Sequence, residues 1–188
     1  MNLLITGIAV WCAVHLFPSV MPAKREALIT RLGNNAYRGL FALVILASLV
    51  TIVLGWRSAT PAAVYAPPLQ GSPIVTVLVF LAFVLFVAAR ARTNLKRFLR
   101  HPQLTGVVIW SAAHLLANGD TRSILLFGGL GAWAVLEIFL INRRDGAWDR
   151  PGAVAIKSDV TVVVIAAVAF TVIFYFHAAL FGVSPMSR

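Results

Sequence analysis

Long apolar runs separated by short polar connections dominate the chain. Six of these runs approach the length that a helix needs to cross about 30 Å of hydrocarbon. They cover residues 2–18, 39–56, 73–89, 104–117, 124–141 and 160–180. The fourth run is the shortest, and its helix can begin near Pro102 because proline is well tolerated in a first helical turn. The pattern predicts an all-α integral membrane protein, a six-helix transmembrane bundle that occupies residues 1–188 as a single domain.

The distribution of Lys and Arg orients this predicted bundle. The connections 22–38, 90–103 and 142–158 hold thirteen of the sixteen basic residues. The other three are Arg57, Arg122 and Arg188. Because basic loops stay in the cytoplasm, we expect these three connections inside and both termini on the extracytoplasmic side. No Lys or Arg precedes the first apolar run, which favours an uncleaved first helix over a signal peptide.

Composition and charge agree with a protein whose main partner is the lipid bilayer. Hydrophobic residues make up 60% of the chain and charged residues 12%, against roughly 25% charged in soluble domains. The net charge of +10 is divided among short clusters, so a nucleic-acid partner is not indicated. Cys12 is the one cysteine, which excludes an intramolecular disulfide. Gly-rich phosphate loops, HExxH and nucleophile-elbow motifs are all missing from the sequence.

Two histidines inside apolar runs are the first candidates for chemistry, since ionisable groups within a membrane are expensive. His114 shares one helical face with Ser111 and Asn118, which lie three and four residues from it. This face predicts either a hydrogen-bonded histidine or a ligand. His15 lies near the cytoplasmic end of the first run, whereas His114 lies nearer the middle of its run. Two such imidazoles can hold haem iron from opposite faces, provided that helix tilt closes the difference in depth.

The run Arg100-His101-Pro102 opens the fourth predicted helix at its cytoplasmic end. It is either a cationic site for a phosphate, carboxylate or cofactor propionate, or a basic anchor at the membrane interface. Glu137 lies about one turn from the cytoplasmic end of the fifth run, and we expect it to form an ion pair with Arg143 or Arg144.

Two further features lie near the outer ends of the predicted helices. Asn118-Gly119-Asp120 predicts a tight turn in which Asp120 caps the fifth helix. His177 follows three aromatic residues near the end of the sixth run, which is typical of an interfacial belt, so we assign it no chemistry.

These polar residues resemble the bacterial NnrU membrane proteins. The resemblance rests on Arg100-His101-Pro102, on Ala113-His114-Leu115-Leu116-Ala117-Asn118-Gly119-Asp120, and on His15-Leu16-Phe17-Pro18-Ser19 at the end of the opening helix. It implies a multi-pass protein of the bacterial inner membrane, associated with nitric oxide metabolism and denitrification. A relative of that family, 15-cis-zeta-carotene isomerase, carries haem b on histidines that match His15 and His114. Ser111 stands where the isomerase has a cysteine.

The hypothesis that follows from the resemblance is haem b ligated by His15 and His114. Arg100 and His101 would lie near the propionates, and Ser111 and Asn118 would border the cofactor. A redox or isomerase-like role would follow, although the sequence does not decide whether the protein is an enzyme. A cofactor-free membrane scaffold or assembly factor is one alternative. A membrane methyltransferase with an RHP motif is another, but Leu104 replaces the tyrosine of that motif.

Overall fold

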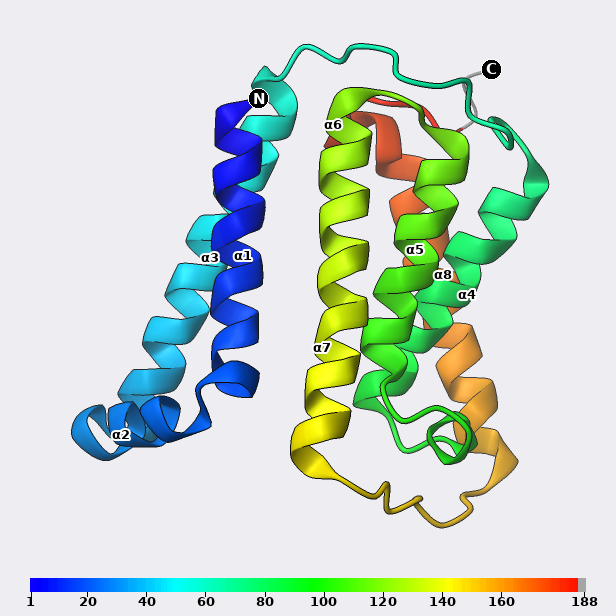
Figure 1. Ribbon diagram of the computed structural model, residues 1–188. Coiled ribbons are helices and arrows are strands. Elements are labelled where there is room, and N and C mark those ends of the chain that lie inside the picture. Colours follow the sequence, from blue (N-terminus) through cyan, green and yellow to red (C-terminus); the bar gives the residue numbers. More distant parts are fainter. Residues whose placement is uncertain (186–188) are drawn as a thin grey trace.

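Helices form most of residues 1–185, the part of the chain that the computed structural model describes (Figure 1). They are α1 (Asn2–Val20), α2 (Pro22–Leu32), α3 (Asn34–Ser58), α4 (Pro73–Arg90), the 3-10 turn η1 (Asn94–Arg97), α5 (Pro102–Ala117), α6 (Thr121–Ser123), the π-helical turn η2 (Ile124–Gly128), α7 (Gly129–Asp145) and α8 (Ile156–Phe181). The elements α6, η2 and α7 follow one another without a break as a single 25-residue helix, Thr121–Asp145.

Five helices within residues 1–185 are long and apolar enough to cross a membrane. They are α1, α3, α4, the continuous helix Thr121–Asp145, and α8. The prediction of an all-helical chain with several membrane-length helices is therefore confirmed. The helix α5 has 16 residues, which corresponds to about 24 Å at 1.5 Å per residue, and it is not one of the five.

The N-terminal part of the chain differs from the prediction in the end of its first helix and in an additional helix. The first helix continues through Pro18 to Val20, since a proline removes one backbone hydrogen bond without forcing the helix to end. The predicted loop 22–38 contains the unpredicted helix α2, which has Pro22 in its first turn and ends at Gly33 with φ 79°. Its Leu28 and Leu32 are exposed beside charged neighbours, a composition typical of a helix that lies along a membrane surface.

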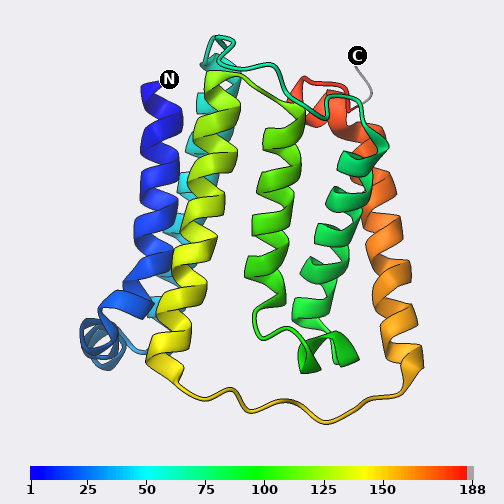
Figure 2. The same ribbon diagram turned by 45° about the vertical axis from the view of Figure 1, so that its right-hand side comes forward.

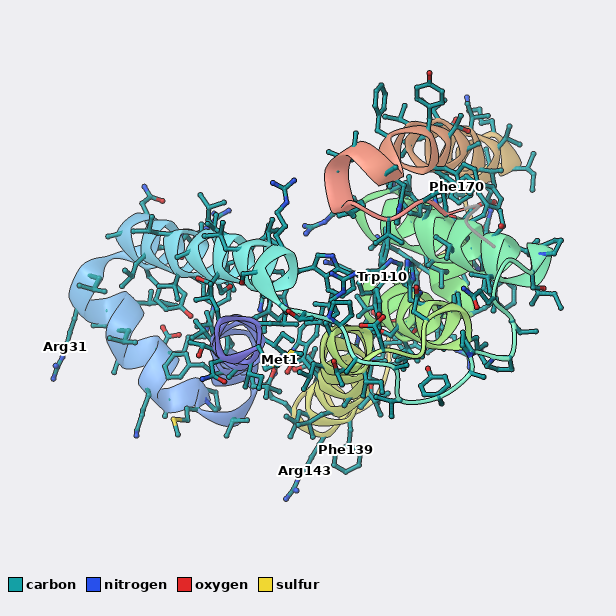
Figure 3. The ribbon with its side chains drawn as sticks, turned by 90° about the horizontal axis from the view of Figure 1, so that it is seen from above. Met1, Arg31, Trp110, Phe139, Arg143 and Phe170 are labelled. Atoms are coloured by element: carbon teal, nitrogen blue, oxygen red, sulfur yellow. The ribbon has the colours of Figure 1, made fainter. Side chains whose placement is uncertain are left out.

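The long helices pack side by side in an arc (Figures 2 and 3). Along this arc α3 packs against α1, α1 against α7, α7 against α5, α5 against α4, and α4 against α8. The helix α7 therefore joins an N-terminal group, α1 to α3, to a second group formed by α4, α5 and α8. The helices α3 and α8 stand at the two ends of the arc, so the concave side lies between them.

The basic connections gather at one end of the bundle. The helix α2, the turn η1 and the connection 146–155 lie at the lower end in Figure 1, whereas the start of α1 and the end of α8 lie at the upper end. The basic clusters predicted to share one side of a membrane are thus on one side of the molecule. Arg188, one of the three basic residues predicted for the opposite side, lies outside the described residues.

Candidate ligand-binding cavity

A cavity of about 530 Å³ occupies the concave side of the arc. Its volume is within the range of roughly 300–1,000 Å³ that small-molecule and cofactor sites occupy. Most of its wall is aliphatic or aromatic, and the aromatic members include Trp11, Trp56, Trp110, Phe83, Phe86 and Phe127. The polar side chains at its wall are His114, Asn118, His177 and Arg57. Such a wall suits a large apolar ligand that carries a few polar groups.

His114 presents a free ring nitrogen at this cavity. Its Nδ1 lies 2.8 Å from the carbonyl oxygen of Trp110, one helical turn earlier. A carbonyl only accepts, so Nδ1 donates, and the neutral ring then carries its lone pair on Nε2. The ring stacks on Phe127 with centroids 4.4 Å apart and planes 26° apart. Phe127 belongs to the π-helical turn η2, a kind of local distortion that is frequent at functional sites.

His15 repeats this local geometry in α1 but does not line the cavity. Its Nδ1 lies 2.9 Å from the carbonyl oxygen of Trp11, again one turn earlier. The ring packs among Trp11, Trp133 and Phe41, at centroid distances of 4.3, 5.0 and 5.8 Å. Trp11 lines the cavity. Of the three rings that contact His15, that of Trp11 also lines the cavity.

His177 is a cavity residue that sequence reasoning missed. It lines the same cavity as His114, and its Nδ1 lies 2.6 Å from the carbonyl oxygen of Val183. Its neighbours Tyr175 and Phe176 are 80% and 50% exposed, as an interfacial belt requires. His177 lies on a different face of α8 and lines the cavity, apart from these exposed aromatic side chains. The available signal was its position on a different helical face from Tyr175.

Ser111 and Asn118, predicted to share a face with His114, lie in different surroundings. Ser111 is 3% exposed and faces α7, where a Cβ built on Gly131 would lie 3.0 Å from the Ser111 Cβ. Asn118 does line the cavity. Its Nδ2 donates to the carbonyl oxygen of His114 at 2.9 Å and so covers the C-terminal end of α5.

Arg100 and His101 directly precede α5, whose start lies at the basic end of the bundle, and neither residue lines the cavity. Arg100 Nη1 donates to the carbonyl oxygen of Gly146 at 2.8 Å. His101 Nε2 lies 2.9 Å from Oδ1 of Asn142. Both side chains thus join the start of α5 to the end of α7.

The prediction that Glu137 forms an ion pair with Arg143 or Arg144 is wrong. Glu137 is 7% exposed, and its Oε1 accepts a hydrogen bond from the hydroxyl of Ser19 at 2.5 Å. Arg144 pairs with Asp145 instead, at 2.7 Å. The partner of Glu137 comes from α1, far away in the sequence, because α1 and α7 pack together.

The predicted helix cap is confirmed. Asp120 accepts hydrogen bonds from the backbone N–H groups of Arg122 and Ser123, both at 3.1 Å. This cap fixes the turn that follows Asn118 and so positions the end of α5 near His114.

Buried polar atoms without a hydrogen-bond partner concentrate around His15. In the part of the chain that the structure describes, six side chains have such an atom: Trp11, Tyr37, Ser111, Arg122, Trp133 and Glu137. Trp11 and Trp133 are in ring contact with His15, and Glu137 binds Ser19, one helical turn further along α1. Buried polar groups are nearly always paired, so an unpaired cluster marks a place where a ligand or water is expected.

The fold and the cavity together define a class of protein. It is an all-helical bundle with membrane-length apolar helices that enclose an aromatic cavity with two imidazoles at its wall. The chain belongs to the NnrU family, because the family model described as NnrU protein matches residues 3–185. No curated protein and no solved structure matches the chain.

Proposed function

We propose that this NnrU-family chain is an integral membrane protein that binds haem b, which His114 and His15 would hold. The observation that carries the proposal is the state of His114. Its Nδ1 is held by the Trp110 carbonyl while its imidazole lines a large aromatic cavity. A histidine whose second nitrogen is held in this way is oriented for ligation through Nε2.

The donor set suits haem better than a bare metal ion. Within residues 1–185, no group of three or more His, Cys, Asp or Glu side chains is arranged to hold a metal. Haem brings four ring nitrogens of its own and requires only one or two axial side chains. Aromatic walls suit its flat apolar face. Arg57 lies at the wall near the outer end of α3 and offers a cation for a propionate, a role that Arg100 and His101 do not reach.

Two observations support His15 as the second ligand. It has the same Nδ1-to-carbonyl arrangement as His114, which leaves Nε2 free. Unpaired indole N–H groups of Trp11 and Trp133 surround it. Trp11 contacts both the cavity and the His15 ring, so a cofactor that reaches both histidines borders this indole.

Bound haem would supply redox chemistry, which fits a role in nitric oxide metabolism in the bacterial inner membrane. The protein's own residues would surround the macrocycle and fix the imidazole rings of His15 and His114. A redox or isomerase-like activity is the enzyme role compatible with this site.

Absorption spectroscopy of detergent-purified protein, expressed with haem supplementation, tests the proposal. We expect a Soret band, loss of most bound haem in His114→Ala, and loss or a changed spectrum in His15→Ala. His177→Ala is the matched control, because it removes another cavity imidazole. Full haem occupancy and an unchanged spectrum in both His15→Ala and His114→Ala would refute the ligand assignment. If His177→Ala alters the spectrum and His15→Ala does not, His177 and not His15 is the second ligand.

We also propose that α5 spans the membrane as a sixth helix, with both chain ends outside. Support comes from its packing between α4 and α7 and from the shared end of the basic connections (Figure 1). Membrane-impermeant labelling of single cysteines in a Cys12→Ala background tests it. Cysteines at residues 62 and 70 should react from outside, and a cysteine at residue 152 should not. Labelling of residue 152 from outside would contradict the orientation.

A further inference from the structure

A second pocket lies at the basic end of the bundle, apart from the aromatic cavity. It has a volume of about 510 Å³ and is open to the surface. The elements around it are the end of α1, the surface helix α2, the start of α3 and the end of α7. Its wall contains three arginines, Arg25, Arg38 and Arg144, together with Tyr37, and its remaining members are apolar. No acidic side chain is among the described residues that line it.

The three guanidinium groups come from three different helices. Arg25 of α2 lies over the ring of Tyr37, 5.7 Å from its centroid. Arg144 of α7 pairs with Asp145 outside the pocket wall and reaches toward the carbonyl of Pro18 at 3.5 Å. Three guanidinium groups at the wall of one pocket favour an anion there, because each is stabilised by a nearby negative charge. Guanidinium groups match the oxygens of phosphate well.

An independent observation at this pocket is the hydroxyl group of Tyr37. Tyr37 is 8% exposed and lines the pocket, and its Oη is buried without a hydrogen-bond partner among the described residues. Burying a hydroxyl group without a partner costs about 1–3 kcal/mol, so a ligand or a water that accepts this hydrogen bond is expected.

The surroundings indicate which anion fits. The helix α2 lies crosswise at the lower ends of α1 and α3 (Figures 1 and 2). Its Leu28 and Leu32, and the preceding Met21, are 39%, 47% and 42% exposed, as expected at the boundary of a bilayer. Basic pockets between membrane helices on the cytoplasmic side are suited to the head groups of anionic lipids. Phe41 adds an apolar contact for the part of a lipid next to its phosphate.

We propose that the pocket formed by Arg25, Arg38, Arg144 and Tyr37 binds the phosphate group of an anionic phospholipid. The arginines supply charge, and the Tyr37 hydroxyl group donates one hydrogen bond to a phosphate oxygen. The bound lipid joins α2 to the ends of α1, α3 and α7 and so fixes the helix group that carries His15. This role is independent of haem in the aromatic cavity.

Binding of short-chain phosphatidylglycerol to the purified full-length protein in detergent tests the proposal, with short-chain phosphatidylcholine and inorganic phosphate as comparison ligands. We expect phosphatidylglycerol to bind at least about tenfold more tightly than phosphatidylcholine. Arg38→Gln and Arg25→Gln should each weaken phosphatidylglycerol binding about tenfold. The matched controls are Arg31→Gln and Arg97→Gln, which remove basic residues at the same end of the bundle but outside this pocket.

Tyr37→Phe keeps the fold and the charge and removes only the hydroxyl group, so a several-fold weaker affinity is expected. Equal losses in the pocket and control variants would show attraction to basic charge in general and overturn the proposal. An absence of preference over phosphatidylcholine would also overturn it. If inorganic phosphate competes with phosphatidylglycerol and binds as tightly, the ligand is a soluble phosphate and the proposal of a lipid ligand is overturned.

Discussion

The helices α1 and α5 contain the same local unit, a tryptophan followed four residues later by a histidine. In α1 the pair is Trp11 and His15, and in α5 it is Trp110 and His114. Each histidine donates from Nδ1 to the carbonyl of its tryptophan. The surroundings differ, since His114 lines a cavity whereas His15 is packed among aromatic rings. The local sequence therefore determines that Nε2 of each histidine carries the lone pair. The neighbouring helices determine which groups this nitrogen can contact.

The way each helix is held explains part of this difference. The backbone of α1 meets α3 at Gly55, where a built Cβ would lie 2.4 Å from the backbone nitrogen of Leu4. At Gly106 of α5 the nearest atom is instead Cε1 of the Phe86 ring, at 2.7 Å. Phe86 also lines the cavity. The α1 contact is backbone against backbone and rigid, whereas the α5 contact involves a side chain that can move with a ligand.

The largest effect is expected from Gly55→Ala. An added methyl group has no space between two backbones, so α1 and α3 must separate. We expect the free energy of unfolding in detergent to fall by about 3 kcal/mol. Gly128→Ala is the matched control, because a Cβ there meets no heavy atom of the described residues within 4 Å. Since alanine favours a helix more than glycine does, this variant should be at least as stable as the unchanged protein. Equal stability of the two variants would contradict the backbone contact.

A smaller loss is expected at the other end of α1, from Ser19→Ala. Ser19 donates the hydrogen bond that Glu137 accepts, and the other carboxyl oxygen of Glu137 is already unpaired. Removing the donor leaves a buried carboxyl group without its side-chain partner, at a cost of about 2 kcal/mol. Denaturant unfolding in detergent measures this change. Glu137→Gln keeps an oxygen that accepts the hydrogen bond of Ser19, so its loss of stability should be smaller. If Glu137→Gln is as unstable as Ser19→Ala, the charge of Glu137 stabilises this contact and not the hydrogen bond.

Gly106→Ala should be milder still and should act on the cavity. The Phe86 ring can turn away from the new methyl group, and alanine favours the helix more than glycine does. We expect a loss of about 1 kcal/mol in the free energy of unfolding. Because the Phe86 ring turns within the cavity wall, the variant should also bind less haem per protein molecule than Gly128→Ala does. Unchanged haem content beside a clear loss of stability would place Phe86 outside the binding site.

The positions of the long helices were predictable because an uninterrupted apolar run of spanning length is seldom compatible with anything but a membrane helix. The start of α5 at Pro102 and the Asp120 cap followed from local preferences of proline and aspartate. The surface helix α2 was not predicted, since a search for apolar runs overlooks a short helix with charged residues.

The inward faces of the helices could not be predicted from the sequence. Helices that are apolar all round give no periodic signal to distinguish a cavity face from a lipid face. The sequence therefore does not separate His177 from Tyr175, although the two face different surroundings. Sequence neighbours likewise indicate Arg143 and Arg144 as partners of Glu137. Its true partner, Ser19, is 118 residues away, and only the packing of α1 on α7 brings the two together.

The smallest effect is expected at Ser111, which occupies in α5 the position that Cys12 occupies in α1, directly after the tryptophan. The Ser111 hydroxyl group is buried without a partner in the described structure, so Ser111→Ala removes an unpaired polar atom and preserves the close contact with Gly131. We expect the free energy of unfolding of haem-free protein to change by less than about 0.5 kcal/mol. The same substitution is then measured in haem-loaded protein, by the change in the free energy of unfolding. A loss there alone would mean that the hydroxyl group gains a partner when the ligand binds, and that the site in α5 extends from His114 toward α7. A loss in both states would mean that Ser111 stabilises the α5–α7 contact itself and has no part in the site.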